Sequence, residues 1–193
     1  MIANLLTGVR LSLALPVAMA FARPEFVSPL VLLVLLLVAI VTDYFDGIVA
    51  RRAHAASPRG QLYDHATDFV FVTAGLGGAA AASEVSVVLP ILIAVAFSQY
   101  VMDSYWLHRE KQLRMSSLGR LNGIMYFVPL VLIALSRVEV IPGHPKVWAV
   151  LVVSLGYALL FSTVVSIIDR AVAPPYPSAP GRSRVTESER CGI

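Results

Sequence analysis

The sequence predicts an all-α membrane protein: a bundle of six transmembrane helices with the N- and C-termini in the cytoplasm. The first observation is composition, because 58% of the 193 residues are hydrophobic and 14% are charged, against roughly 45–50% and 25% in soluble domains. The second is that the apolar residues form six runs, each about long enough to cross the hydrocarbon core. The third is that Lys and Arg favour one side of these runs. A water-soluble globule would need more polar surface.

The six runs lie at about 3–22, 27–48, 61–82, 86–107, 119–136 and 147–168. The second and the sixth are the clearest, and the first is the weakest because Arg10 interrupts it. Its Ala18-Met19-Ala20 also resembles a cleavage site, so a signal peptide is the alternative interpretation. A signal peptide carries its positive charge ahead of the apolar region, whereas apolar residues precede Arg10. We therefore expect the first run to be retained as a helix.

Positive residues orient the predicted bundle. Eleven Lys and Arg residues follow the second, fourth and sixth runs, and three lie at the opposite ends of the runs. Because positive residues remain on the cytoplasmic side, both termini and the segment between the second and third runs are expected there. The formal net charge of +3 and the pI near 9.2 are then explained by basic loops beside anionic lipid. No nucleic-acid partner is expected.

Two parts of the chain differ in composition. Residues 1–170 contain all six runs and form the predicted membrane domain. Residues 171–193 are rich in Pro, Ser and charge, so they cannot bury enough apolar area to fold, and a disordered cytoplasmic tail is expected. The chain has a single cysteine, Cys191, which excludes an intramolecular disulfide.

Four aspartates lie at the predicted cytoplasmic edge of the membrane. Asp43 and Asp46 are three residues apart at the end of the second run, and Asp64 and Asp68 are four apart at the start of the third. Each pair therefore shares one face of a helix. Acidic groups at such sites are rare without a function and require compensation, either by arginines such as Arg10 in a salt-bridge network or by divalent cations.

Divalent cations are the interpretation that we favour for this cluster. Carboxylate oxygens suit the hard ions Mg²⁺ and Mn²⁺ rather than zinc. Four carboxylates suggest two ions, which is enough to clamp a diphosphate during an in-line displacement. Between the acids, Gly47 and Ala50 leave a notch where a flat group can approach the backbone. Arg51 can bind a phosphate with its guanidinium fork, and Gly60 permits a tight turn into the next helix.

The pattern Asp43-x2-Asp46-Gly47-x2-Ala50-Arg51-x8-Gly60-x3-Asp64-x3-Asp68 resembles, at every specified position, the signature of the CDP-alcohol phosphotransferase family. The resemblance implies a six-helix membrane enzyme, usually a homodimer, that moves a substituted phosphate group from a CDP-linked substrate to an alcohol and releases CMP. It implies that Asp43, Asp46 and Asp64 bind metal, and that Asp68 is a ligand of the second metal, the general base, or both. It also implies that the cytidine lies near Gly47 and Ala50.

Other residues extend this expected site. Asn4, Thr7 and Arg10 recur every three residues, which places them on one helix face, and they resemble the N-terminal stretch of the family's glycerophosphate-using branch. Arg10 is expected near the substrate phosphates or the aspartates, with snorkelling to the surface as the alternative. Arg120 can bind an acceptor phosphate or anchor a helix at the interface. His65 is interpreted first as an interfacial polar group and second as a base, and Asp103 as a residue of the substrate pocket.

Three functions remain open at this point. The favoured one is a phospholipid-synthesis enzyme of the cell membrane that uses CDP-diacylglycerol and a polar alcohol, with Mg²⁺ or Mn²⁺ at a cytoplasmic active site. The second reverses the partners, because "SPRGQLYDHATD" resembles a stretch of the choline and ethanolamine phosphotransferases, whose acceptor is a diacylglycerol. The third is a cation-coupled transporter, although its ion site would be expected near the membrane midplane.

Overall fold

The computed structural model describes residues 2–52, 58–102, 117–138 and 145–172, and every regular element within these ranges is an α-helix. The helices are α1 (Ile2–Ala22), α2 (Pro29–Arg52), α3 (Pro58–Ala81), α4 (Val88–Met102), α5 (Ser117–Met125), α6 (Phe127–Ser136) and α7 (Pro145–Val172). Each of the six apolar runs thus contains at least one helix, and the described residues outside the helices lie at the ends of the runs, apart from Tyr126. The last helix continues to Val172, slightly past the boundary expected at residue 170.

The fifth predicted helix is divided in two, which the hydrophobic pattern did not indicate. α5 ends at Met125 and α6 begins at Phe127, with Tyr126 between them. Pro129 lies in the first turn of α6 and has no N–H to donate to the carbonyl of Met125, and a proline ring also crowds that carbonyl. The break one turn before Pro129 is therefore a proline effect.

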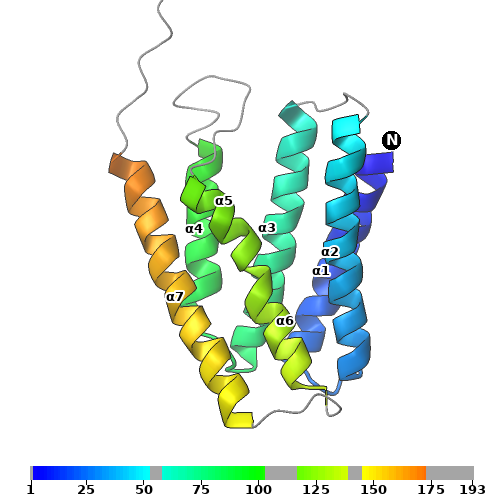
Figure 1. The fold of residues 1–193 in the computed structure, drawn as a ribbon, viewed down its shortest axis with the longest axis vertical. Helices are drawn as coiled ribbons and strands as arrows, with labels where there is room; N and C mark the ends of the chain where they lie inside the picture. The colour runs from blue at the N-terminus through cyan, green and yellow to red at the C-terminus, as the bar shows by residue number, and fades with distance from the viewer. Residues whose placement is uncertain (1, 53–57, 103–116, 139–144, 173–193) are drawn as a thin grey trace, which may run out of the picture.

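The helices form two groups joined by the α5–α6 segment (Figure 1). Helices α1, α2 and α3 lie together, α4 packs on both α3 and α7, and α6 reaches from α7 to α2. The closest approach is between α1 and α3, where a Cβ added to Gly78 would lie 2.1 Å from the carbonyl oxygen of Ala18. Only glycine permits this contact. The core between the groups is apolar and includes Val17, Phe21, Leu36, Phe71, Leu76 and Leu130.

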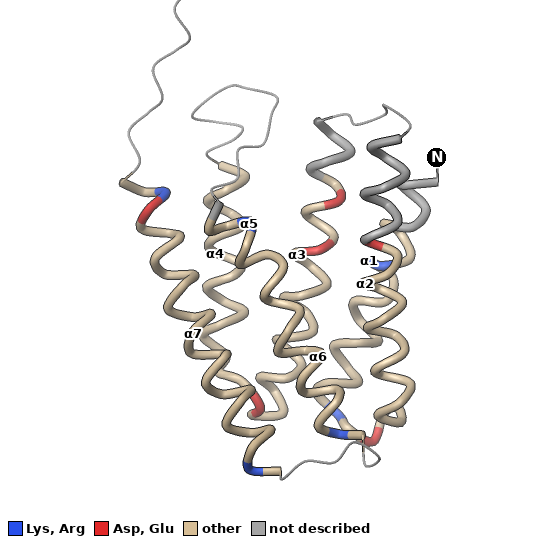
Figure 2. Tube along the Cα trace, in the orientation of Figure 1, with Lys and Arg blue, Asp and Glu red and all other residues tan. Residues whose placement is uncertain are grey.

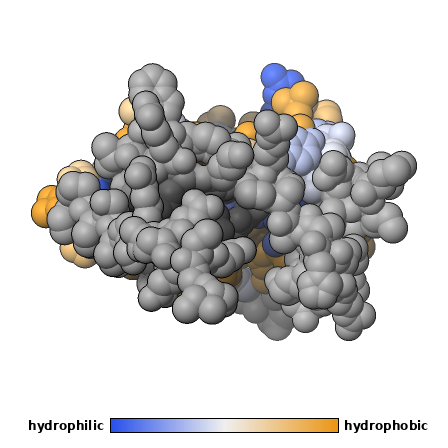
Figure 3. Space-filling model, turned by 90° about the horizontal axis from the view of Figure 1, so that it is seen from above, coloured by the Kyte–Doolittle hydropathy of each residue, from blue (hydrophilic) through white to orange (hydrophobic). Residues whose placement is uncertain are grey.

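Apolar residues also cover much of the outside of the bundle. Within the described residues, two helical segments are long and apolar enough to cross a membrane, and three further apolar helical stretches are shorter. The two segments are Leu118–Ser136, which runs through α5 and α6, and Pro145–Val172. Figure 2 shows acidic and basic positions towards the two ends of the bundle, with a belt free of them between. Seen from the end that bears the N-terminus, hydrophilic residues lie beside hydrophobic ones at the rim (Figure 3). This arrangement fits membrane burial, while the number of spans stays a prediction.

An arginine ties three elements together at the end of the bundle opposite the N-terminus. Arg137 follows α6, and its guanidinium donates to both carboxylate oxygens of Glu84, at 3.2 and 2.9 Å. It also donates to the carbonyl oxygens of Ala20 and Phe21 in the last turn of α1, at 2.9 and 2.8 Å, and lies over the Phe21 ring. Arg137 therefore caps α1 and joins it to α6 and to the α3–α4 connection.

Candidate active site

Arg10 lies at the centre of three aspartates from two other helices. Its Nη2 is 3.0 Å from Oδ1 of Asp43 on α2, and its Nη1 is 3.6 Å from Oδ1 of Asp64 on α3. Nη1 also donates a hydrogen bond to Asp68, one turn further along α3. Asp43 from the first aspartate pair of the motif and both acids of the second pair, which begins 21 residues later in the sequence at Asp64, thus converge on one guanidinium.

Close packing of α1 against α3 places Arg10 inside the bundle rather than at its surface. The Arg10 side chain is fully buried, whereas the side chains of Asp43, Asp64 and Asp68 keep 40%, 34% and 26% of their surface exposed. Thr7, one turn earlier on α1, is buried as well. The alternative of an arginine snorkelling to the surface is therefore wrong. The carboxylates, unlike the guanidinium, remain accessible to a ligand.

The negative charge of this cluster exceeds its positive charge. One guanidinium faces three carboxyl groups, so among these four side chains the acidic groups outnumber the basic one. Oδ1 of Asp64 is buried and accepts no hydrogen bond within the described part of the chain. Its ion pair with Nη1 of Arg10 is long, at 3.6 Å, and a buried oxygen without a hydrogen bond is costly. A salt-bridge network alone leaves this imbalance. The donor set, oxygen from several carboxylates, fits a divalent cation such as Mg²⁺ or Mn²⁺.

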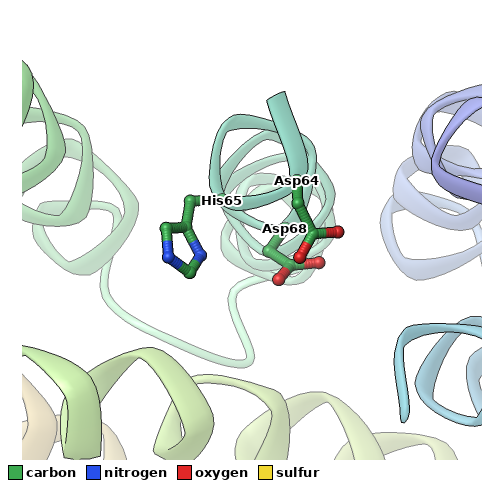
Figure 4. A group of neighbouring side chains, drawn as sticks. All are labelled: Asp64, His65 and Asp68. Carbon is green, nitrogen blue, oxygen red and sulfur yellow. The ribbon is translucent and has the colours of Figure 1, made fainter. Parts of the chain in front are cut away.

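Asp64 and Asp68 also form a compact group with His65. One potential ligand atom from each of these three residues lies within 4.8 Å of the others. Figure 4 shows the two carboxylates on the same side of α3, with the imidazole projecting from another side of the helix. The His65 ring meets the Tyr100 ring of α4 edge-on, with centroids 6.4 Å apart. Helical geometry predicts this divergence, because consecutive residues are separated by about 100°.

A cavity of about 510 Å³ begins at the aspartates and extends between α3, α4, α5, α6 and α7. Most of its wall is apolar, and includes the parallel, stacked rings of Phe69 and Phe97, with centroids 4.2 Å apart. Asp43, Asp64, His65 and Asp68 form one polar region of the wall. The cavity therefore offers an apolar chain and an acidic centre to one ligand or to two adjacent ligands.

A second polar region of the wall comes from α4, α5 and α7. It contains Gln99, Arg120, Ser166 and Arg170, and the Arg170 guanidinium lies 5.1 Å from the centre of the Tyr100 ring. Of these, the sequence singled out only Arg120, and Arg170 was counted only as a charge that orients the membrane helices. Gln99 carried a signal that was not used, since it is an amide within an otherwise apolar run.

Several predicted site residues have no described side chain. Asn4 lies in the first turn of α1, and Gly60 lies in the first turn of α3. Asp46, Gly47, Ala50 and Arg51 lie in the last two turns of α2. For these six positions the structure describes the backbone alone, so their roles stay predictions. Asp103 lies outside the described residues.

Comparison with protein families identifies the family of this chain. The family model for CDP-alcohol phosphatidyltransferase matches residues 1–169, which cover most of the chain and all seven helices except the end of α7. Comparisons with curated proteins and with solved structures gave no match.

Proposed function

Because this chain belongs to the CDP-alcohol phosphatidyltransferase family, we propose that it transfers a phosphatidyl group from CDP-diacylglycerol to a polar alcohol and releases CMP. The observation that carries this proposal is the convergence of Asp43, Asp64 and Asp68 around Arg10 at the mouth of a cavity of about 510 Å³. An acidic centre opening into an apolar space is suited to a substrate that is a diphosphate at one end and a lipid at the other.

The residues that would hold the metal are Asp43, Asp46, Asp64 and Asp68. Two bound divalent cations would neutralise the diphosphate and stabilise the charge that develops on the CMP leaving group. Arg10 orients the carboxylates by contacting three of them at once. His65, beside Asp64, supplies a further polar contact to a ligand in the cavity.

The reaction itself makes limited demands on the protein. The oxygen of the acceptor alcohol forms a bond to the phosphorus of the phosphatidyl group, the bond between that phosphorus and the CMP oxygen breaks, and CMP leaves with the electron pair. The alcohol proton passes to Asp68, whose carboxylate faces the cavity. Positioning and charge neutralisation supply most of the acceleration in such transfers; the buried guanidinium contributes to positioning, because it holds the three aspartates in place.

The wall of the cavity supports a lipid donor and a polar acceptor. Phe69, Phe97, Ile93 and Phe127 form an apolar surface for acyl chains. Arg120 and Arg170, at the second polar region, are able to hold an anionic group such as a phosphate or a carboxylate. Both surfaces belong to the cavity that the aspartates line, where the reacting groups of the two substrates have to meet.

Placement in the membrane is part of the proposal. Helices α2 and α3 are each 24 residues long, about 36 Å at 1.5 Å per residue, which exceeds the hydrocarbon thickness of about 30 Å. We assign six membrane spans to the chain. Both termini and the aspartates are placed on the cytoplasmic side, because the excess of Lys and Arg lies there. A homodimer in the cell membrane completes the proposal.

The second candidate is the reversed reaction, in the sense that the lipid is the acceptor rather than the donor: phosphocholine or phosphoethanolamine moves from its CDP-linked form to a diacylglycerol. The position of His65 on the cavity wall supports it, since a histidine follows the third aspartate in the enzymes that this stretch resembles. Purified protein with Mg²⁺ or Mn²⁺ should release CMP from CDP-diacylglycerol in the presence of a polar alcohol. Release from CDP-choline with diacylglycerol instead would establish the reversed reaction, and ion flux without CMP would reject both.

A further inference from the structure

Helix α5 is a short helix that carries part of the cavity wall. It is nine residues long and ends at Met125, where the break before α6 begins, and it packs on α6 and α7. Its Leu121 and Ile124 side chains are 56% and 66% exposed, so they bury little apolar area against the rest of the protein. The position of α5 therefore depends on the residues of its remaining face.

Two hydrogen bonds join this remaining face, and Tyr126 directly after it, to α7. Oγ of Ser162 donates to Oδ1 of Asn122 at 2.7 Å, and the hydroxyl oxygens of Tyr126 and Thr163 are 2.7 Å apart. Thr163 donates its own proton to the carbonyl oxygen of Leu159, at 2.6 Å. A hydroxyl has one proton to donate, so Tyr126 is the donor in its contact with Thr163. We call the four side chains of these two contacts the α5–α7 seam.

The cavity lies against another face of α5. Gly119, Arg120, Gly123 and Ile124 line it. Successive residues of a helix are separated by about 100°, which places Arg120 and Asn122 about 160° apart around the axis. A rotation of α5 about this axis would move Arg120 along the cavity wall and break the seam. Because hydrogen bonds depend on direction as well as distance, the seam fixes this rotation more narrowly than apolar contacts would.

Arg120 is the charged residue that α5 brings to the cavity. It is exposed and lines the cavity that the aspartates also line, so an anionic group in the cavity can reach its guanidinium. A guanidinium binds phosphate or carboxylate through a fixed fork of N–H groups, and the strength of that binding depends on its orientation. The orientation of α5 therefore affects how well Arg120 binds an anion.

We propose that the α5–α7 seam positions Arg120 at the cavity wall for the anionic group of a substrate. This inference rests on the proposed function, in which Arg120 holds such a group. Asn122, Ser162 and Thr163 do not line the cavity. They are positioning residues, because their effect on a substrate passes through α5 and Arg120 rather than through direct contact.

The first test is kinetic and follows CMP release from CDP-diacylglycerol, with glycerol 3-phosphate, inositol phosphate and serine as acceptors. Arg120→Met should raise the KM for one of the two substrates by at least about 10-fold, since a hydrogen bond to a charged group is lost. Ser162→Ala and Thr163→Val should each raise the same KM by about 3- to 10-fold. Their kcat should stay within about 2-fold, as expected when binding alone is weakened.

A double-mutant cycle separates positioning from packing. If the seam acts through Arg120, adding Ser162→Ala to Arg120→Met should change this KM by no more than about 2-fold, whereas independent effects would multiply. Ser154→Ala is the matched control on α7, because Oγ of Ser154 donates to the carbonyl oxygens of Val150 and Leu151 in its own helix, at 2.7 and 3.2 Å. This control should leave both KM values within about 2-fold.

A second readout requires no substrate. Cys191 is the single native cysteine and Leu121 is exposed, so a nitroxide on Leu121→Cys in a Cys191→Ser background reports the motion of α5 in the full chain. The electron paramagnetic resonance spectrum should show a more mobile label when Ser162→Ala or Thr163→Val is added. Addition of Ser154→Ala should leave the spectrum unchanged.

Each other result overturns the inference. Multiplied effects in the double mutant, unaltered KM values in both seam variants, or unaltered label mobility would each reject the positioning role while leaving CDP-alcohol transfer intact. Unchanged KM values for both substrates in Arg120→Met would remove the group that the seam is proposed to position. Absence of CMP release with every acceptor would reject the proposed function, and this inference with it.

Discussion

An arginine joins neighbouring helices at each end of this bundle, and the two arginines differ in the number of acidic groups that they contact. Arg137 faces one carboxylate, Glu84, and two backbone carbonyl oxygens. Arg10 faces three carboxylates. Both link α1 to α3 or to the turn that follows it. At Arg137 the charges balance and the donors match the acceptors, which is the arrangement expected of a structural clamp.

At Arg10 the charges do not balance. The three acids keep contact with a cavity, and Oδ1 of Asp64 accepts no hydrogen bond within the described residues. Folding alone gains little from clustering carboxylates, because like charges at short range repel. The difference between the two ends teaches that a cluster in which accessible acids outnumber the basic group is suited to binding a cation, whereas a balanced cluster is suited to joining helices.

The largest difference in activity between the two ends should appear when one acid at each end is changed to the corresponding amide. Asp68→Asn should lower the rate of CMP release by about 10³-fold, because it removes the proposed proton acceptor and one charge of the cluster. Glu84→Gln is the matched control at the balanced end and should leave turnover per folded molecule within about 2-fold. An equal loss of turnover per folded molecule in both variants would contradict the distinction between a catalytic end and a structural end.

The next largest effect should be on the Mn²⁺ requirement, which should change only when an acid near Arg10 is replaced. Asp43→Ala should raise the Mn²⁺ concentration needed for half-maximal CMP release by about 10- to 100-fold, as expected when a ligand or its supporting group is lost. Asp169→Ala, an exposed acid of α7 that does not line the cavity, is the control and should not change the Mn²⁺ requirement. Titrations of both variants against the unaltered protein provide the measurement, and an unchanged Asp43→Ala would remove that residue from the metal site.

The balanced end should instead govern stability. Arg137→Met leaves Glu84 and two carbonyl oxygens without their donor, and should lower the free energy of unfolding by about 3 kcal/mol. Thermal unfolding in detergent measures this loss, with turnover of the remaining folded protein as the second readout. Preserved stability with lost turnover would mean that the two ends have the opposite roles to those assigned here.

A smaller effect should follow from separating α1 and α3. Gly78→Ala places a methyl group 2.1 Å from the carbonyl oxygen of Ala18, so α1 must shift, at a cost of about 1–3 kcal/mol. Gly77→Ala is the neighbouring control, because its Cβ would meet nothing within 4 Å. It should be neutral or slightly stabilising, since alanine favours a helix more than glycine. Similar melting temperatures for the two variants would contradict the close packing that positions Arg10.

Much of the fold follows from patterns along the chain. Six apolar runs predict the helices because a helix in lipid satisfies its own backbone hydrogen bonds. The division at Tyr126 was missed because the hydrophobic pattern continues through it, although Pro129 provided a local signal. The motif predicted that Asp43, Asp64 and Asp68 belong together, and the expected position of Arg10 near them is observed.

The second polar region of the cavity could not be predicted in the same way. Tyr100 and Arg170 are 70 residues apart, and the Arg170 guanidinium lies over the Tyr100 ring only because α4 packs on α7. No spacing rule relates residues on helices that are not adjacent in the sequence. Arg170 also had a sufficient explanation as a charge that orients the membrane helices, which removed the reason to consider it further.

The central claim is that the aspartates around Arg10 bind divalent cations. The most direct test is anomalous diffraction from crystals of the full chain soaked with Mn²⁺ and CDP-diacylglycerol. The claim predicts anomalous peaks between the carboxylates of Asp43, Asp64 and Asp68. Full occupancy of substrate with no peak among these side chains, and with Arg10 as their only counterion, would contradict it.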